Sequence, residues 1–443
     1  MITRYRQIIL HVGMHKTGTT SIQNNTHRMR EALLEHDIYY PSFLYNDILK
    51  VNHSGPITAL VSESPDRYGE QWRTDMGSDI DSIQRQYQSY FSEILESPKA
   101  QTLVLSGETT SAFDIEDLQK IRDALEAHTD KLRVLVYIRD PSNSVASTLQ
   151  QRIRGGGDLS RSRHIRNLAG VVRRRYTRLI EVFPDSLEVI NFHEEVASEA
   201  GLVGSFLIRC GFPTELVNDM KFSSANPRIS MEAFKVMSAI NKRYPAFPIT
   251  SNTSSTPEAA SPRETRARQY NDLRSLSYLP GQSFRLESLE DQKMQEAIQE
   301  ETQWLEDNLK IAFPVQRESA AGPLWDESVL LCLEDAIRDL GNREHQLAAA
   351  DFLMSESQEL LESQPYASAI LAFTARKIHA TKHDPLTSIV KRLGADYFKN
   401  GALQAESYSF ELALELMKIA EHLRPDGGTI KQSIAKYLKK LDK

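Results

Sequence analysis

The sequence predicts an α/β domain, built on a parallel β-sheet with helices on both faces, followed by an all-α appendage. Two observations support the α/β domain: short apolar runs rich in β-branched residues alternate with stretches of helical periodicity, and the first run leads directly into a glycine-containing loop. A third observation defines the appendage, because the chain beyond about residue 319 is rich in leucine and alanine and has only helical patterns. We therefore predict a first domain over residues 1–316 and a helical domain over residues 319–443.

Five apolar segments are expected to form the strands of the sheet. In chain order they cover residues 8–12, 38–41, 102–105, 132–138 and 187–192. Apolar residues at helical spacing predict helices over residues 21–36, 79–96 and 300–311, and another that begins near Val145. Strands that alternate with helices form parallel sheets, whose ligands bind outside the carboxyl ends of the strands. The residues that directly follow these strands are therefore expected to form the binding site.

The loop after the first strand has the composition of an anion-binding loop. Gly13 and Gly18 keep the glycine spacing of the Walker A pattern, G-x-x-x-x-G-K-[ST]. Thr19 and Thr20 stand where that pattern has a lysine and a hydroxyl residue, and the only lysine, Lys16, lies inside the loop. A glycine loop that leads into a helix directs backbone N–H groups and the helix N-terminus at an anion. The displaced lysine argues against an ordinary ATP or GTP hydrolase.

A second polar segment follows the strand predicted over residues 132–138. Arg139-Asp140-Pro141 ends this strand, and Ser147 lies eight residues after Arg139, where a helix is expected to begin. Arginine offers a planar fork of donors to phosphate, and a serine near a helix start adds a hydroxyl where the helix dipole favours anions. The alternative role of Arg139 and Asp140 is a salt bridge at the end of the strand.

Together, the two segments resemble the bacterial, P-loop-like family of PAPS-dependent sulfotransferases, which use 3′-phosphoadenosine 5′-phosphosulfate (PAPS) as sulfuryl donor. The resemblance covers about residues 7–313. It implies that Arg139 and Ser147 bind the 3′-phosphate of the donor, and that the product is the 3′,5′-bisphosphate, PAP. It also implies that the donor's 5′-phosphosulfate is held by the first loop, through Gly13, His15, Lys16, Thr17, Gly18, Thr19, Thr20 and Ser21. No metal is expected to take part.

Lys16 is the residue expected to stabilise the transition state. Sulfuryl transfer resembles phosphoryl transfer, in which the group passes in line through a loose transition state and catalysis depends on positioning and charge stabilisation. Negative charge grows on the bridging oxygen as its bond to sulfur breaks. A lysine beside that oxygen therefore stabilises the transition state more than the ground state. A lysine within a loop of glycines and threonines fits this role better than that of a solvated surface residue.

The acceptor hydroxyl needs a base, and two residues are candidates. Glu108 follows the third strand in Leu-Ser-Gly-Glu-Thr-Thr, which is similar to the Ser-Ser-Glu strand ending of many bacterial members of the family. It would need a raised pKa to act near neutral pH, and its alternative roles are to cap a helix or to pair with an arginine. His53 is the second candidate, because bacterial members of the family often carry a histidine-containing loop at this point. Its alternative role is that of an exposed loop histidine without a catalytic function. Of the histidines that flank the first loop, His15 is expected to support the site and His11 to pack in the sheet.

An excess of basic residues follows the second segment. Residues 152–178 contain nine arginines against one acidic residue, Asp158. Runs of charge are usually solvated faces, but in a protein of net charge −7 this excess predicts a basic rim for the nucleotide or for an anionic acceptor. Gln151 and Arg154 are the candidate acceptor-binding residues, since they resemble a Gln-x-x-Lys pair of bacterial relatives. The family and Glu108 together imply a carbohydrate, glycolipid or glycosylated metabolite as acceptor.

Two further segments organise the rest of the chain. Residues 249–268 are rich in serine, threonine and proline and predict a mobile loop. In the helical domain, six residues fall at the spacings of one tetratricopeptide repeat (TPR): Tyr397, Gly401, Ala413, Met417, Ala420 and Pro425. One repeat is too short for a solenoid, so a TPR-like helical segment is expected at most. Its alternative roles are to bind a protein partner or to pack as a plain helix pair.

The composition limits the class of protein. Hydrophobic residues make up 40% and charged residues 26% of the chain, as in ordinary globular proteins. The net charge of −7 does not favour nucleic-acid binding, and no apolar run approaches the ~20 residues needed to cross a membrane. No leader-like run precedes the first strand, and Cys210 and Cys332 form no metal or redox motif. We therefore expect a cytoplasmic protein of bacterial origin.

Two other functions are compatible with the same sequence. A kinase that uses ATP would also need a phosphate-binding loop, although the Walker lysine is missing and no acidic cluster for magnesium is evident. A non-catalytic nucleotide-binding or interaction protein could combine the same α/β domain with a helical module. The presence of Lys16, Arg139 and Ser147 argues against a non-catalytic protein.

Overall fold

The chain, seen in a computed structural model, forms two compact units. The structure describes residues 3–45, 48–68, 80–157, 170–218, 220, 222, 228–246, 271–286, 292–313, 324–379, 394–407 and 409–441. Unit 1 comprises Met1–Thr148, Ser162–Asn226 and Leu286–Arg317, and unit 2 comprises Leu149–Arg161, Pro227–Arg285 and Glu318–Lys443. This grouping differs from the predicted division, because residues 227–285 belong with the C-terminal helices. The predicted division into domains of residues 1–316 and 319–443 stays a prediction.

Unit 1 is built on a sheet of five parallel strands in the order β2-β5-β1-β6-β7. The strands are β1 (Gln7–His11), β2 (Ile38–Tyr39), β5 (Thr102–Ser106), β6 (Leu132–Ile138) and β7 (Leu187–Asn191). Each corresponds to one of the apolar segments chosen from the sequence, so the predicted parallel α/β class is confirmed. The central strand is β1, in which Ile9 lies opposite Val104 of β5 and Arg133 of β6.

The strand order places a crossover beside β1. The chain passes from β1 to β2 and β5 on one side of it, and then crosses to β6 and β7 on the other side. At such a crossover the loops diverge and leave a crevice outside the carboxyl ends of the strands. Lys16, Glu108 and Arg139 follow β1, β5 and β6 respectively, so they lie at this one edge of the sheet.

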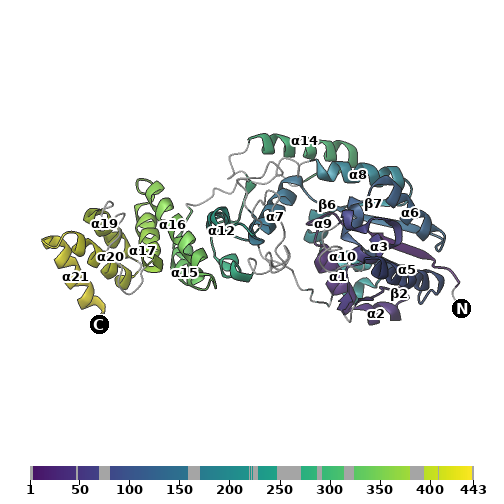
Figure 1. Cartoon of the computed structure of the whole chain (residues 1–443), viewed down its shortest axis with the longest axis horizontal. Coiled ribbons are helices and arrows are strands. Elements are labelled where there is room, and N and C mark those ends of the chain that lie inside the picture. Colours follow the sequence, from purple (N-terminus) through teal and green to yellow (C-terminus); the bar gives the residue numbers. More distant parts are fainter. Residues whose placement is uncertain are drawn as a thin grey trace. The chain divides into compact units, whose positions relative to one another are not determined.

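Helices bury both faces of the sheet (Figure 1). Ile8 and Leu10 of β1 belong to one apolar core and Ile9 to the other, as the alternation of side chains along a strand requires. The first core is covered by α3 (Ser54–Val61), α5 (Ile80–Glu96), α6 (Ile115–Glu126), α8 (Val171–Val182) and α14 (Gln292–Leu309). The second is covered by α1 (Thr19–Arg28), α2 (Arg30–Glu35), α10 (Gly201–Arg209) and α11 (Thr214–Asn218).

Some elements of unit 1 differ from the sequence prediction. The sequence predicts no strand or helix between residues 42 and 64, but the described residues there form an antiparallel pair, β3 (Phe43–Tyr45) and β4 (Ile48–Lys50), and the helix α3. The helix expected near Val145 is α7 (Pro141–Arg154), which begins earlier because the Asp140 carboxylate accepts the backbone N–H of Ser142 at 2.9 Å and proline favours the first helical position. The short elements are α9 (Phe192–Ala197) and two 3₁₀ helices, Pro65–Tyr68 and Glu108–Ala112.

One buried carboxylate of α14 holds the N-terminal end of α8. Glu301 accepts the backbone N–H groups of Gly170 at 2.6 Å and of Arg173 at 2.9 Å. These donors belong to the first turn of a helix and have no partner within it. Burial raises the pKa of the Glu301 carboxyl, although the backbone hydrogen bonds act in the opposite direction. The helix expected over residues 300–311 lies within α14 and therefore also carries a cap for α8.

Replacing Glu301 with alanine is expected to lower the free energy of unfolding by about 1–3 kcal/mol, because two helix N–H groups lose their acceptor. Urea unfolding followed by circular dichroism would measure the change. Glu300→Ala, an exposed substitution on the same helix, is the matched control and should change stability by less than about 0.5 kcal/mol. Equal midpoints for the two variants would contradict the capping role.

Unit 2 is helical, which confirms the predicted all-α appendage. Its helices are α12 (Met231–Arg243), α15 (Glu327–Arg338), α16 (Arg343–Glu359), α17 (Pro365–His379), α19 (Ala395–Ala405), α20 (Phe410–Leu423), α21 (Gly428–Leu441) and a 3₁₀ helix, Ser275–Tyr278. Buried Glu232 of α12 accepts the backbone N–H of Trp325 at 3.2 Å, and Glu356 of α16 accepts from the indole Nε1 of Trp325 at 2.9 Å. The same Glu356 contacts Lys235 of α12. A TPR-like character of these helices stays a prediction.

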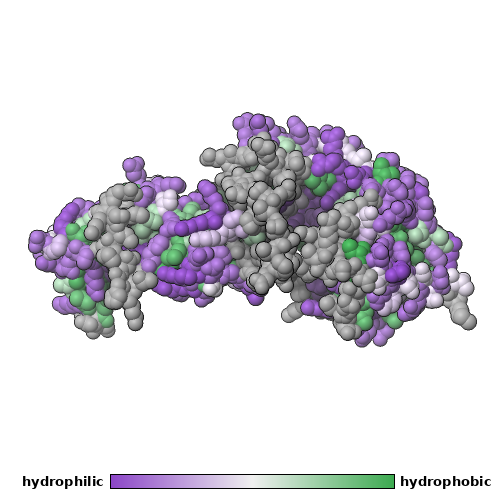
Figure 2. All heavy atoms as spheres, viewed as in Figure 1, coloured by the Kyte–Doolittle hydropathy of each residue, from purple (hydrophilic) through white to green (hydrophobic). Residues whose placement is uncertain are grey.

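Hydrophilic residues predominate on the face seen in Figure 2. The large apolar side chains that are exposed lie on separate elements, for example Leu34, Tyr278 and Leu331. Within the described ranges, no helix combines the length and apolar character needed to cross a membrane. The loop predicted over residues 249–268 lies outside the described residues.

Candidate active site

The loop between β1 and α1 is shaped by three residues in the left-handed backbone region. They are Gly13 with φ 54°, Lys16 with φ 72° and Gly18 with φ 73°. The φ of Gly18 favours glycine, and a Cβ atom there would also lie 2.3 Å from Leu202 Cδ2, so that the leucine side chain would have to move. A left-handed lysine costs about 1–2 kcal/mol. Such local strain is concentrated at functional sites, which makes Lys16 a candidate by its backbone as well as by its charge.

The threonines of the loop have different roles. Thr17 Oγ1 donates to the carbonyl oxygen of Met14 at 2.6 Å, so this hydroxyl braces the loop. Thr19 begins α1 and is buried, and its hydroxyl has no hydrogen-bond partner among the residues that the structure describes. A Cβ atom on Gly13 would lie 3.1 Å from that hydroxyl and 3.3 Å from Glu108 Cα. A buried hydroxyl beside the backbone N–H groups of a first helical turn fits an anionic ligand. The same turn also contains Thr20, which is exposed, and Ser21, which is half-buried.

Arg139 connects the loop to the end of β6. Its Nη1 atom donates to the carbonyl oxygen of Lys16 at 2.8 Å, and its guanidinium lies 5.1 Å from the ring centroid of Phe192. This contact fixes the two basic residues at the same edge of the sheet. It also places a permanent positive charge beside the phosphate-type loop, because an arginine stays protonated in proteins.

Ser147 does not lie at a helix start. Because α7 begins at Pro141, Ser147 is two turns into the helix, where it is half-buried. The first turn is served instead by Asp140, whose carboxylate accepts from the Ser142 backbone and from the Asn143 side chain at 2.8 Å. The helix-dipole argument for Ser147 therefore does not apply, and its binding of a 3′-phosphate stays a prediction.

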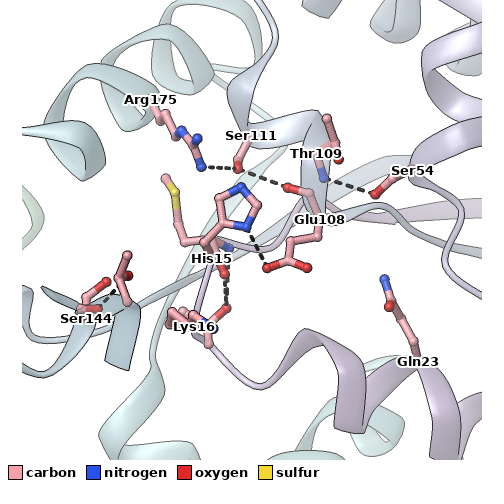
Figure 3. Close-up of polar contacts among 12 residues, drawn as sticks. His15, Lys16, Gln23, Ser54, Glu108, Thr109, Ser111, Ser144 and Arg175 are labelled. Carbon is pink, nitrogen blue, oxygen red and sulfur yellow. Dashed lines mark hydrogen bonds and ion pairs between the residues drawn. The ribbon is translucent and has the colours of Figure 1, made fainter. Parts of the chain in front are cut away.

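Glu108 and His15 form a close polar pair at the carboxyl end of the sheet (Figure 3). Glu108 opens the 3₁₀ helix after β5, and His15 immediately precedes Lys16 in the loop after β1. The distance from His15 Nδ1 to Glu108 Oε1 is 2.7 Å, with the imidazole 51% exposed and the carboxylate 24% exposed. Two neighbouring strands thus bring together a carboxylate and an imidazole that are far apart in the sequence.

The ionisation of Glu108 differs from the sequence-based expectation. Burial by itself would raise the pKa of this carboxyl, but the hydrogen bond from His15 and the proximity of His15 and Lys16 outweigh it and hold the pKa below its usual value. Glu108 is therefore ionised at neutral pH. The raised pKa that suits a carboxylate base near neutrality is not found.

Arg175 of α8 is a site residue that the sequence did not single out. Its Nη1 atom donates to Ser111 Oγ at 3.3 Å, and that hydroxyl donates to the backbone carbonyl of Glu108 at 3.1 Å (Figure 3). Burial lowers the pKa of its guanidinium, while the charge of Glu108 acts to raise it. A signal was present in the sequence, because Arg175 falls between Val172 and Leu179 at the spacing of the buried face of α8.

His53 has a structural role in this fold. Its ring is fully buried; Nε2 donates to the carbonyl oxygen of Pro41 at 2.9 Å, and Nδ1 accepts the backbone N–H of Ser106 at 3.0 Å. Burial lowers the pKa of His53 to about 3, so the ring is neutral. The two nitrogens fasten the start of α3 to the backbone that follows β2 and to the end of β5, and His53 is therefore not retained as the candidate base. His11 is buried in the sheet as expected, with Nδ1 2.9 Å from Ser106 Oγ.

The candidate acceptor-binding residues lie at the end of α7, in unit 2. Gln151 is exposed and Arg154 is buried. Their role toward an acceptor stays a prediction. Three arginines of the basic segment lie outside the described residues: Arg161, Arg163 and Arg166.

Comparisons with known proteins give a weak structural likeness. No protein-family model and no curated protein sequence matches the chain. Among solved structures, the chain is similar to a crystal structure of a sulfotransferase from Alicyclobacillus acidocaldarius, with a TM-score of 0.33 and 17% identity, over 54% of this chain and 93% of that chain. At this TM-score the likeness supports no assignment of a residue's role.

The described site combines binding and proton-transfer groups at one edge of the sheet. The glycine loop that carries Lys16 is fastened to Arg139, and the pair of His15 and Glu108 lies beside the same loop. Among the described residues, no three or more His, Cys, Asp or Glu side chains are grouped as a metal site would require. This arrangement can hold an anionic group and move a proton next to it.

Proposed function

We propose that the protein is a sulfotransferase that moves a sulfuryl group from PAPS to an acceptor hydroxyl of a carbohydrate, glycolipid or glycosylated metabolite. One observation carries the proposal: the lysine of the phosphate-type loop is displaced inside the loop, strained, and fastened through its carbonyl to Arg139. A Walker lysine would follow Gly18 and reach the β- and γ-phosphates of a nucleoside triphosphate. Lys16 instead precedes that glycine, next to the proton-accepting pair.

The residues present fit the donor. The buried hydroxyl of Thr19 and the backbone N–H groups of the first turn of α1 would hold its 5′-phosphate, in the space that a Cβ atom on Gly13 would fill. Arg139 would bind a further phosphate of the nucleotide with its guanidinium fork. Ser147 is proposed as a second ligand of that phosphate.

The chain's own groups would perform three tasks during transfer. Lys16 would neutralise the charge that grows on the bridging oxygen as the S–O bond of the donor breaks. The pair of His15 and Glu108 would take the proton that leaves the acceptor hydroxyl as the new S–O bond forms. Arg139 would hold the loop in the geometry that aligns the attacking and leaving oxygens.

Calorimetry with PAP and with ATP plus Mg²⁺ tests the proposal on the full chain. Binding of PAP without metal, tighter than binding of ATP with Mg²⁺, is the expected result. The reverse preference would favour a kinase that uses ATP. Absence of binding by either nucleotide, in a folded protein, would favour a non-catalytic interaction protein.

A further inference from the structure

The contact between His15 and Glu108 fixes which ring nitrogen can accept a proton. The Glu108 carboxyl has a lowered pKa, so it is ionised at neutral pH and can only accept in this hydrogen bond. The hydrogen of the 2.7 Å contact therefore belongs to His15 Nδ1. In the neutral imidazole, the lone pair then lies on Nε2.

The second nitrogen of His15 is accessible. Among the residues that the structure describes, none forms a hydrogen bond with Nε2. The imidazole is 51% exposed. Figure 3 shows the ring lying against Glu108 through Nδ1, with the opposite side of the ring turned away from that carboxylate. A ring held at one nitrogen and accessible at the other has the arrangement of an oriented general base.

We propose that His15 is the general base of the reaction, accepting the acceptor's proton at Nε2, and that Glu108 is a positioning residue that selects the tautomer and stabilises the charged ring. The inference rests on the proposed sulfuryl transfer. It reverses the order of the two residues expected from the sequence, where Glu108 was the base and His15 a supporting residue.

Basicity favours His15 over Glu108. An efficient base has a pKa near the working pH, and an imidazole ordinarily titrates near about 6.5. A carboxylate whose pKa is held below its usual value of about 4.5 accepts a proton poorly near neutrality. The same charge that makes Glu108 a weak base makes it a good partner for an imidazolium.

The proton and electron balance is simple. The acceptor oxygen forms a bond to sulfur, the S–O bond to the donor's phosphate breaks with its electron pair staying on the phosphate oxygen, and the acceptor's proton moves to His15 Nε2. The Nδ1 hydrogen remains between His15 and Glu108 throughout. Release of the proton from Nε2 to water restores the neutral ring.

Several charged groups surround this pair and will affect its pH dependence. Lys16 follows His15 in the loop, Arg175 of α8 interacts electrostatically with Glu108, and His11 of β1 lies behind the carboxylate. Burial lowers the pKa of His11 to about 4, so this ring stays neutral across the physiological range. Arg175 stays positive there, because a guanidinium does not lose its proton in proteins.

Two substitutions separate the roles of His15 and Glu108. His15→Asn keeps an N–H donor where Nδ1 lies but removes Nε2, and Glu108→Gln keeps an acceptor for Nδ1–H but removes the charge. His422→Asn, at an exposed position of α20, is the matched control. Release of PAP from PAPS with water as acceptor provides an assay that does not require the natural acceptor.

We expect His15→Asn to lower the rate of PAP release by about a hundredfold or more and to abolish the rise in rate between pH 5.5 and 7.5. Glu108→Gln should lower the rate less and keep that rise, and added imidazole should partly restore His15→Ala. The inference is overturned if His15→Asn keeps the wild-type rate and pH profile while Glu108→Gln loses activity, because Glu108 would then be the base.

Nitrogen-15 NMR of the histidine rings provides a second readout that needs no turnover. The His15 resonances, assigned by their loss in His15→Asn, should show hydrogen on Nδ1 and a lone pair on Nε2 in the neutral ring, and Glu108→Gln should weaken that preference. The opposite tautomer would overturn the inference. Failure of the wild type to bind PAP would instead remove the proposed function, with the tautomer result unaffected.

Discussion

Replacing Lys16 with methionine is expected to lower turnover by about two to three orders of magnitude, the usual effect of losing one group that stabilises transition-state charge. Methionine keeps much of the length and the apolar stem of lysine but has no charge. PAP binding should weaken much less, because the backbone N–H groups and Thr19 of the loop are unchanged. Comparing the change in kcat with the change in the dissociation constant of PAP, each relative to the wild type, measures this separation.

The backbone of Lys16 requires its own control. Its φ of 72° means that a substitution can change the loop's strain as well as its charge. Lys16→Gly relaxes the strain and removes the charge, so it should be as inactive as Lys16→Met. Lys120→Ala, which removes a half-buried lysine of α6 that pairs with Glu116, should be fully active. Turnover within tenfold of the wild type in Lys16→Met would contradict the role assigned to this residue.

Replacing Arg139 with alanine is expected to weaken PAP binding by about 10- to 100-fold, since hydrogen bonds to charged groups contribute about 1.5–3 kcal/mol. The loss has two sources. The nucleotide loses a phosphate ligand, and the carbonyl oxygen of Lys16 loses the donor that lies 2.8 Å away. Turnover should fall too, because the loop that carries Lys16 loses its attachment to β6. Calorimetry with PAP and the rate of PAP release measure the two effects.

Arg139→Lys tests whether charge or geometry matters at this position. Lysine keeps the charge but cannot donate simultaneously to a phosphate and to the Lys16 carbonyl with a planar fork, so PAP binding should be only partly restored. Arg30→Ala, at an exposed arginine of α2, is the control for a general loss of positive charge. Equal effects of Arg139→Ala and Arg30→Ala on PAP binding would show that Arg139 does not contact the nucleotide.

Local sequence patterns were sufficient for the framework of unit 1. Parallel strands buried on both faces need continuous apolar runs, and residues such as Ile8, Ile9 and Leu135 supply them, so each strand could be located from composition alone. The glycine spacing located the loop that enters α1. The start of α7 was missed by four residues, because the combination of Asp140 as a cap and Pro141 as a first helical residue was not recognised in the sequence.

Contacts between distant segments could not be located in this way. The antiparallel pair of β3 and β4 lies in a stretch with no clear period. The buried position of His53 depends on Pro41 and Ser106, which lie 12 and 53 residues away in the chain. Arg175 is one arginine among nine, and its spacing on the buried face of α8 does not reveal its contact with Ser111.

The sequence by itself located the five strands of the parallel sheet along the chain and placed Lys16, Glu108 and Arg139 after three of them, because these features depend on periodicity and on turn residues that act over a few positions. The tertiary structure alone decided what each polar side chain contacts. It committed both nitrogens of His53 to the backbone, and it joined His15 to Glu108 across β1 and β5. Proton affinity depends on burial and on charges within a few ångströms, and those distances are set only when the strands pair.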